Sequence, residues 1–391
     1  MKRKVLVLVG TRPEAIKMAP VVKALRDRGD LFDVMLVSTG QHREMLAQTL
    51  KDFALEPDIN LDLMTLNQSL PQLSSLLLTS IDSVLVRETP DIVLVQGDTT
   101  TVMTAALCAF YRGIPCGHVE AGLRSYNVHA PFPEELNRRI AGLVANLHFA
   151  PTARAVTALQ NEGIPHRTIH LTGNTGIDAL LWTVKDIQAT PPELPYPIQE
   201  LIASGRRFVL ITGHRRESFG TGFESICHAL QNLALVHRDV AFLYPVHMNP
   251  NIHRPVFHAL SGFPNILLTD PLPYRQFVAV MQAAYCLLTD SGGVQEEAPS
   301  LKKPVLVMRD VTERPEGVEA GCSRLVGTDY ERIIQSVSAV LWNTDGLYQR
   351  MVASENPYGD GCAAERIAAT LSDFFQPGTT INAHRYRNNM V

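Results

Sequence analysis

The segment Tyr285-Cys-Leu-Leu-Thr289, followed by Asp290-Ser-Gly-Gly-Val-Gln-Glu-Glu-Ala298, decides how this chain is organised. The first five residues predict a buried parallel strand, and the pattern after the glycines predicts a helix that ends near Leu301. A Ser-Gly-Gly turn between strand and helix lets backbone N–H groups approach a phosphate. Glu296 and Glu297 follow one turn later, where their carboxylates could accept hydrogen bonds from ribose hydroxyls. We therefore predict a site for a nucleotide diphosphate, and an ordinary tight turn is the alternative.

Short apolar strands alternate with amphipathic helices along most of the chain, which predicts parallel sheets covered by helices. The expected strands are residues 5–9, 34–39, 91–95, 116–119, 147–150, 168–172, 208–212, 240–246, 266–269, 286–289 and 305–308, with helical patterns at 19–28, 101–112 and 134–146. The stretch 189–197 contains four prolines and predicts a stiff connector. We expect an α/β protein of two doubly wound domains, 1–186 and 198–361, facing one another across a cleft, with 379–391 as a tail.

The composition excludes several classes of function. A chain of 391 residues exceeds the usual size of a single core, so two domains are expected. A net charge of −4 gives no excess of positive charge of the kind that binds nucleic acid or an anionic membrane. No apolar run is long enough to span a bilayer, and the first apolar run is too short for a signal peptide. The six cysteines have neither metal nor paired spacing, which predicts reduced, mostly buried thiols in a cytoplasmic protein.

Polar residues gather at the carboxyl ends of the predicted strands, where doubly wound sheets bind ligands. They are Asp98, Glu120, His214, His247, Asp290 and Ser291. Because this placement recurs in both halves, a shared site between the domains explains it. Each residue could instead cap a neighbouring helix, and Asp98 before Thr99-Thr-Thr101 could do only that.

Charged residues in the N-terminal half suit acid–base chemistry beside an anion. Arg12 and Lys17 lie near a helix start without the glycines of a dinucleotide or Walker A loop, and a solvated pair is the alternative. Three carboxylates could serve as general acid and base on a sugar, a pattern that also fits a glycoside hydrolase: Asp98, Glu120 and Glu134. The adjacent acids Glu134 and Glu135, taken alone, are typical of a solvated helix start.

The C-terminal half supplies cations and a histidine. His214 precedes two arginines and could donate a proton to a departing diphosphate. Arg314 is a predicted substrate contact, whereas Arg309 and His247 are predicted to be structural. No His, Cys or Asp cluster has metal spacing, so no metal is expected.

Taken together, eleven segments resemble, in one register, the motifs of the non-hydrolysing UDP-N-acetylglucosamine 2-epimerases. They are residues 10–20, 41–46, 97–101, 117–124, 133–138, 173–180, 212–220, 244–250, 290–301, 309–316 and 356–361. The resemblance implies a GT-B fold of two Rossmann-like domains, the first completed by a C-terminal helix at 362–378. It also implies a cytoplasmic homodimer without a cofactor that interconverts UDP-GlcNAc and UDP-ManNAc for surface polysaccharides.

The resemblance further implies a mechanism and a set of site residues. UDP is eliminated anti across C1–C2 to give 2-acetamidoglucal, and then adds back after reprotonation on the opposite face, while the domains close around it. The implied catalytic residues are Asp98, Glu120, Glu134 and His214, with the division into acids and bases left open. The implied sugar and phosphate contacts are Arg12, Lys17, Arg138 and Arg314. Ser291, Gly292 and Gly293 match the diphosphate cradle, Glu297 the ribose ligand and Phe277 the uracil neighbour.

Three features depart from the family pattern. Leu272 stands where many members have a glutamine near the uracil, so backbone groups are expected to recognise the base. The positions that match an allosteric substrate site of some members are Gln41, Glu44, Arg215 and His247. An arginine of that site is Asn67 here, which argues against allosteric activation. The loop 125–130 differs from the commoner form and leaves a modified UDP-HexNAc substrate open.

Four other functions stay open at this point. A GT-B glycosyltransferase would share the fold and the nucleotide cradle but need an acceptor. A hydrolysing epimerase would release free ManNAc and UDP. An NAD-linked oxidoreductase would need the glycine fingerprint that the sequence lacks. A non-catalytic UDP-sugar sensor would have no turnover to lose.

Overall fold

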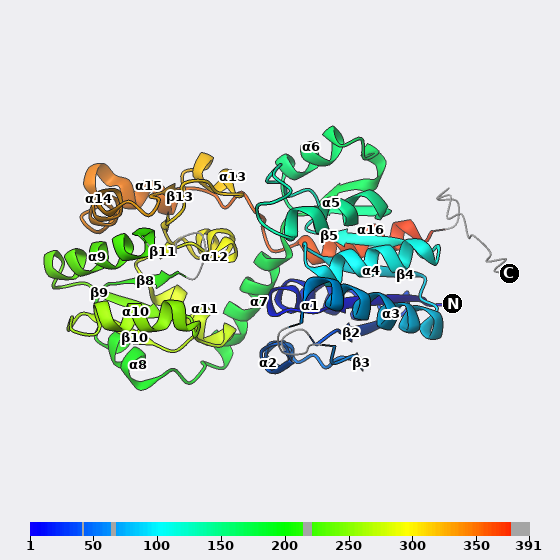
Figure 1. Cartoon of the computed structure of the whole chain (residues 1–391), viewed down its shortest axis with the longest axis horizontal. Helices are drawn as coiled ribbons and strands as arrows, with labels where there is room; N and C mark the ends of the chain where they lie inside the picture. Colours follow the sequence, from blue (N-terminus) through cyan, green and yellow to red (C-terminus); the bar gives the residue numbers. More distant parts are fainter. Residues whose placement is uncertain (41–42, 64–67, 214–220, 377–391) are drawn as a thin grey trace. The chain divides into compact units, whose positions relative to one another are not determined.

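The computed structural model describes residues 1–40, 43–63, 68–213 and 221–376, without the side chains of residues 43–45, 221 and 251. The chain divides into two compact units (Figure 1). Unit 1 comprises Met1–Ala179 and Gly359–Val391, and unit 2 comprises Leu180–Tyr358. The chain therefore leaves unit 1 and returns to it at its C-terminal end.

The sheet of unit 1 has, within the described residues, seven parallel strands in the order β3-β2-β1-β4-β5-β6-β7. The strands are β1 (Arg3–Val9), β2 (Phe32–Ser38), β3 (Ile59–Asn60), β4 (Ile92–Gln96), β5 (Cys116–Val119), β6 (Leu147–Ala150) and β7 (Ile169–Leu171). The order reverses between β1 and β4. At such a switch point the loops diverge and leave a crevice at the carboxyl ends of the strands.

Helices cover both faces of this sheet, because right-handed crossovers that run in opposite directions from β1 and β4 place their helices on opposite sides. The helices are α1 (Arg12–Arg26), α2 (Arg43–Asp52), α3 (Leu70–Glu88), α4 (Thr100–Tyr111), α5 (Glu134–Val144), α6 (Ala153–Asn161), the start of α7 (Thr175–Ala189) and α16 (Ala363–Phe374), with a 3-10 turn at His166–Thr168. One layer contains α3, α4 and α5, and the other contains α1, α2 and α16. Apolar side chains of α3 and α4, such as Leu77, Ile81 and Ala105, pack with Leu6 and Val93 of the strands.

The C-terminal helix α16 is fixed to unit 1 by a carboxylate of α7. Asp178 accepts hydrogen bonds from the backbone N–H groups of Ala363 (3.2 Å) and Ala364 (2.8 Å), and so caps the start of α16. Arg366 in turn donates to the carbonyl oxygen of Thr172 at 2.9 Å. These bonds explain why the returning segment belongs to the first unit.

Unit 2 repeats the design with, in its described residues, six parallel strands in the order β10-β9-β8-β11-β12-β13. The strands are β8 (Phe208–Thr212), β9 (Ala241–Pro245), β10 (Ile266–Thr269), β11 (Cys286–Thr289), β12 (Val305–Val307) and β13 (Ser323–Leu325). The helices are α8 (Tyr196–Ala203), α9 (Thr221–Val236), α10 (Pro250–Leu260), α11 (Tyr274–Ala283), α12 (Gly292–Glu297), α13 (Pro315–Glu319), α14 (Tyr330–Leu341) and α15 (Leu347–Ala353), with 3-10 turns at Ala298–Leu301 and Thr344–Gly346. The switch point lies between β8 and β11.

The prediction of an α/β protein with two doubly wound, Rossmann-like domains is confirmed. The unit boundary falls inside α7, between Ala179 and Leu180, and the proline-rich stretch lies within unit 2. Side chains of α11 hold that stretch there. Arg275 donates to the carbonyl oxygen of Thr190 (2.8 Å), and Gln276 donates to the carbonyl oxygen of Glu193 (2.7 Å).

Two further findings bear on the expectations from composition. Among the described residues, no helix combines the length and the apolar content needed to cross a membrane. Five cysteines are buried and Cys362 is exposed, as free thiols, which confirms the prediction of mostly buried thiols.

Candidate functional site

The turn between β1 and α1 is fixed by Glu14, a buried carboxylate that the sequence analysis did not single out. Thr11 caps α1, and Glu14 Oε2 accepts hydrogen bonds from the N–H groups of Gly10 (3.0 Å) and Thr11 (2.6 Å). Glu14 Oε1 accepts a bond from Thr99 Oγ1 at 2.7 Å, which ties this turn to the end of β4. Burial raises the pKa of Glu14, and these hydrogen bonds oppose the rise. The pattern Thr-x-x-Glu is a capping box, so the sequence did carry a signal for it.

Lys17 of α1 forms an ion pair with Glu120, which follows β5. The two side chains are only 12% and 8% exposed. Glu120 has a φ of 63°, a left-handed conformation that is uncommon outside glycine and is often found at functional sites. Because the pair is shielded from water, removal of either partner would take away a charge that stabilises the other.

His118 links the turns that carry Asp98 and Glu120. Its Nε2 lies 2.7 Å from the carbonyl oxygen of Gly97, and the ring is buried. Burial lowers the pKa of His118 to about 3, so the ring is neutral, and we assign its proton to Nε2 because a carbonyl can only accept. Gly97, with a φ of 82°, directly precedes Asp98. The histidine thus holds the end of β4 beside the end of β5.

Asp98 pairs with Arg138 of α5. Asn137 on the same helix donates from Nδ2 to the backbone carbonyl of Asp98 at 2.9 Å. The cap of α4 is Thr99, whose side chain accepts from the N–H of Val102. The alternative that Asp98 acts as a helix cap is therefore wrong, and its side chain keeps 27% of its surface exposed.

Glu134 and Glu135 open α5 in different surroundings. Glu135 is fully buried and accepts hydrogen bonds from the N–H of Ser125 (3.0 Å) and from Nη1 of Arg138 (3.3 Å). Glu134 is half-buried at the first position of the helix. The alternative that both are a solvated helix start is wrong for Glu135, because Arg138 lies one turn along the same helix. Arg12 is half-buried at the start of α1.

In unit 2, side chains join the two strands that flank the switch point. The hydroxyl oxygens of Thr212 and Thr289 are 2.5 Å apart, and Thr289 Oγ1 accepts the N–H of Ser291 at 2.9 Å. The buried Tyr244 hydroxyl donates to the carbonyl oxygen of Gly213 at 3.1 Å. These bonds fix the ends of β8 and β11, from which the Ser-Gly-Gly turn starts.

Arg314 lies directly against the first glycine of that turn. A Cβ added to Gly292 would be 2.6 Å from Arg314 Cζ, whereas one added to Gly293 meets no atom of the described residues within 4 Å. Arg314 Nε donates to Glu296 Oε1 at 2.7 Å, and its Nη1 donates to Glu313 Oε2 at 3.1 Å. The absence of a side chain on Gly292 therefore lets a guanidinium lie at the start of α12.

The two acids of the Gln-Glu-Glu sequence have different partners, although both were predicted to suit ribose. Glu296 pairs with Arg314, whereas Glu297 Oε1 accepts a hydrogen bond from the Tyr274 hydroxyl at 3.1 Å. Tyr274 and Glu297 are both buried. Phe277, half-buried, lies one turn after Tyr274 on α11. Neither Tyr274 nor the role of Glu296 was predicted.

The positions predicted for an allosteric site are only partly described. His247 is exposed, and its Nδ1 accepts the N–H of Asn249 at 3.1 Å. Glu44 falls on α2, without a described side chain, and Gln41, Arg215 and Asn67 lie outside the described residues. The predicted catalytic residue His214 also lies outside them. In the part of the chain that is described, no three His, Cys, Asp or Glu side chains group as metal ligands would.

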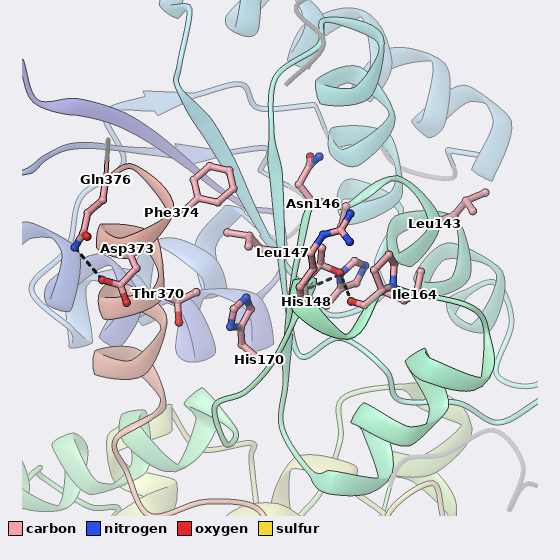
Figure 2. A pocket seen from close by; sticks show the side chains of 14 residues that line it. Leu143, Asn146, Leu147, His148, Ile164, His170, Thr370, Asp373, Phe374 and Gln376 are labelled. Carbon is pink, nitrogen blue, oxygen red and sulfur yellow. Dashed lines mark hydrogen bonds between the residues drawn. The ribbon is translucent and has the colours of Figure 1, made fainter. Parts of the chain in front are cut away.

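A cavity of about 710 Å³ lies at a different place in unit 1 (Figure 2). His148 and His170, near the amino ends of β6 and β7, line it together with Thr370 and Phe374 of α16. None of the predicted site residues that the structure describes lines this cavity, which lies near the amino ends of the strands rather than their carboxyl ends. It does not mark the predicted site.

Comparisons with known proteins all find similarity to UDP-N-acetylglucosamine 2-epimerases. The model of the family described as UDP-N-acetylglucosamine 2-epimerase matches residues 23–372. The UDP-N-acetylglucosamine 2-epimerase of Escherichia coli K12 is 49% identical over 375 residues, which cover 95% of this chain and 98% of that protein. The enzyme of that name from Yersinia pestis is 49% identical over 373 residues, with the same coverage. The structure of UDP-GlcNAc 2-epimerase from Neisseria meningitidis bound to UDP-GlcNAc is 43% identical with a TM-score of 0.88, and covers 95% of this chain and all of that chain.

Proposed function

This chain belongs to the UDP-N-acetylglucosamine 2-epimerase family, and from that premise we propose that it interconverts UDP-GlcNAc and UDP-ManNAc without hydrolysing either. The observation that supports this most directly is the presence of two carboxylate–cation pairs at adjacent strand ends of unit 1. Glu120 pairs with Lys17, and Asp98 pairs with Arg138. The substrate is carried over from the Neisseria relative, which is described as bound to UDP-GlcNAc.

The proposed reaction proceeds by elimination of UDP. The C2–H beside the acetamido group is too weakly acidic to be removed and returned at that carbon without loss of the leaving group. A base takes the C2 proton, the C1–O bond breaks with its electron pair going to UDP, and a C1=C2 double bond forms. Return of a proton to the opposite face of C2, with addition of UDP to C1, gives the epimer. The balance requires neither water nor a redox cofactor.

Unit 1 supplies the groups for proton transfer in this proposal. The carboxylates are Asp98, Glu120 and Glu134, and two proton-transfer positions are needed because protons leave and arrive on opposite faces of C2. Lys17 and Arg138 fix two of these carboxylates and place positive charge beside them. Arg12 is proposed as a further contact to the sugar or phosphate.

Unit 2 supplies the groups for UDP. We assign the diphosphate to the turn Ser291–Gly293 and to Arg314, whose planar guanidinium can bind two phosphate oxygens at once. Glu297, held by Tyr274, is assigned to the ribose, and Phe277 to the uracil. His214, which lies outside the described residues, is assigned to protonation of the departing UDP.

We further propose that the chain works as a cytoplasmic homodimer and supplies UDP-ManNAc for surface polysaccharides. In support of a dimer, Phe110 and Tyr111 at the end of α4 leave 59% and 66% of their surfaces exposed. Such aromatic exposure is typical of surfaces that bind another protein. Light scattering should give twice the mass of one chain, and a monomer at assay concentration would contradict the dimer.

The function is tested by following UDP-GlcNAc with the purified protein by ¹H and ³¹P NMR, without any acceptor. The proposal expects signals of UDP-ManNAc and an intact diphosphate ester at equilibrium. Free ManNAc with UDP would instead identify a hydrolysing epimerase. Substrate that stays unchanged until an acceptor is added would identify a glycosyltransferase.

A further inference from the structure

Glu135 is a buried carboxylate that the proposed reaction does not use. It lies beside Glu134 at the start of α5, and none of its surface is exposed. We propose that Glu135 is a positioning residue that fixes the guanidinium of Arg138 against Asp98. This inference rests on the proposed role of Asp98 in the epimerisation.

The guanidinium of Arg138 contacts both Glu135 and Asp98, so the position of Glu135 constrains that of Asp98. Its Nη1 donates to Glu135 Oε2 at 3.3 Å, and its Nη2 donates to Asp98 Oδ2. Both nitrogens belong to one rigid plane, so a guanidinium held at Nη1 has little freedom at Nη2. Asn137 bonds the backbone of Asp98 from the same helix. Helix α5 therefore fixes both the main chain and the carboxylate of Asp98.

Because Glu135 is buried, its contact with the Arg138 guanidinium is strong. Its Oε2 accepts both the Ser125 N–H and the Arg138 bond, and its Oε1 accepts no hydrogen bond from a described residue. A buried carboxylate with so few partners depends on its cation, because an isolated charge in the interior costs several kcal/mol. Ser125 also opens the loop 125–130, so the same carboxylate fixes that loop relative to Arg138.

A purely structural salt bridge is the competing explanation, and unit 1 contains a matched control for it. Arg124 donates to Glu162 through Nε and Nη2, both at 2.7 Å, and its side chain is 1% exposed. This pair has no hydrogen bond to Asp98. Loss of the Glu162 charge therefore reports the cost of an ion pair without a change at Asp98.

The first measurement compares kcat and KM of Glu135→Gln and Glu162→Gln with the wild type. The glutamine of the first variant keeps the shape and the acceptor oxygen of the side chain, but it removes the negative charge, so the contact with the Arg138 guanidinium is no longer an ion pair. We expect kcat of E135Q to fall about tenfold or more while KM stays within about threefold, because misplacement of a reacting group lowers the chemical step. We expect kcat of E162Q to stay within about twofold.

The second measurement places E135Q in an Arg138→Lys background. A lysine lacks the rigid plane that fixes two donor nitrogens relative to one another, so the geometric route from Glu135 to Asp98 is already broken. E135Q should then lower kcat by less than about twofold, a non-additivity that a structural role would not produce. If E135Q lowers the folded fraction, Glu135→Asp, which keeps the charge but shortens the side chain, takes its place and should lower kcat by about threefold to tenfold.

The outcomes separate this inference from the proposed function. An active wild type with an unchanged kcat in E135Q, or an equal loss in the wild-type and Arg138→Lys backgrounds, would overturn the positioning role alone. A folded wild type that forms no UDP-ManNAc would overturn the proposed function and the positioning role with it.

Discussion

Replacement of Gly292 by alanine should destabilise unit 2, because an arginine occupies the space that the methyl group needs. The added Cβ would be 2.6 Å from Cζ and 2.7 Å from Nη1 of Arg314, closer than real Cβ contacts. The Arg314 side chain must move, and the movement breaks its 2.7 Å bond to the buried Glu296. Gly293, the next residue on the same helix, has open space for a Cβ and serves as the matched control.

The expected magnitude combines two opposing terms. A hydrogen bond between charged groups contributes about 1.5–3 kcal/mol to stability. Alanine in place of glycine within a helix stabilises by up to about 1 kcal/mol. Gly292→Ala should therefore destabilise by about 1–2 kcal/mol, whereas Gly293→Ala should stabilise by up to about 1 kcal/mol. For a unit of this size, Tm should fall by roughly 2–8 °C in the first variant and rise by up to about 4 °C in the second.

Differential scanning calorimetry of the wild type and both variants measures the two shifts. The same Gly292→Ala change in an Arg314→Ala background should then stabilise, because the obstructing side chain is gone. Equal shifts in G292A and G293A, or a destabilisation that persists without Arg314, would refute the reasoning.

Three further predictions concern other contacts. Lys17→Met should lower kcat more than about 100-fold and lower Tm, because it removes the cation beside the shielded Glu120 carboxylate. An added Glu120→Gln should restore Tm but not activity, and an active K17M would count against the pair. Burial raises the pKa of Asp178, the cap of α16, to about 6, above its ordinary 3.8, so its contribution to stability is full below about pH 4 and is lost as pH rises through 6. Asp178→Asn should remove up to about 3 kcal/mol of that pH dependence in urea unfolding, and equal pH slopes for variant and wild type would disprove it. Tyr274→Phe removes the donor 3.1 Å from Glu297 and should raise KM about fivefold with little change in kcat, whereas an unchanged KM would argue against Glu297 as the ribose ligand.

The sequence predicted most of the fold because buried parallel strands read as short continuous apolar runs. Expected strands 116–119 and 286–289 match β5 and β11. The short strands β3 and β13, which lie at the edges of their sheets, were missed. Helix α1 runs from Arg12 to Arg26, which agrees with the helix start expected near Arg12 and Lys17. The helical pattern at 19–28 covers only its second half, because the Thr11 capping box initiates the helix and it continues through Pro20. The family resemblance read from the motifs is confirmed.

The partners of the candidate site residues could not be predicted in the same way. The sequence places Asp98 and Glu120 after strands, but the pairing of Glu120 with Lys17 joins residues 103 positions apart and depends on how α1 packs. Glu135 looks like a solvated helix start until Arg138 and the Ser125 N–H are seen around it. Such contacts are tertiary, and local patterns do not encode them.

Deuterium uptake from D2O tests the central claim most directly. Wild-type protein is incubated with UDP-GlcNAc in D2O, and both epimers are analysed at C2 by NMR and mass spectrometry at equilibrium. Removal and return of the C2 proton by the enzyme's carboxylates predicts one deuterium at C2 of UDP-ManNAc and its gradual appearance in UDP-GlcNAc. UDP-ManNAc that forms with its original C2 hydrogen retained would contradict the account.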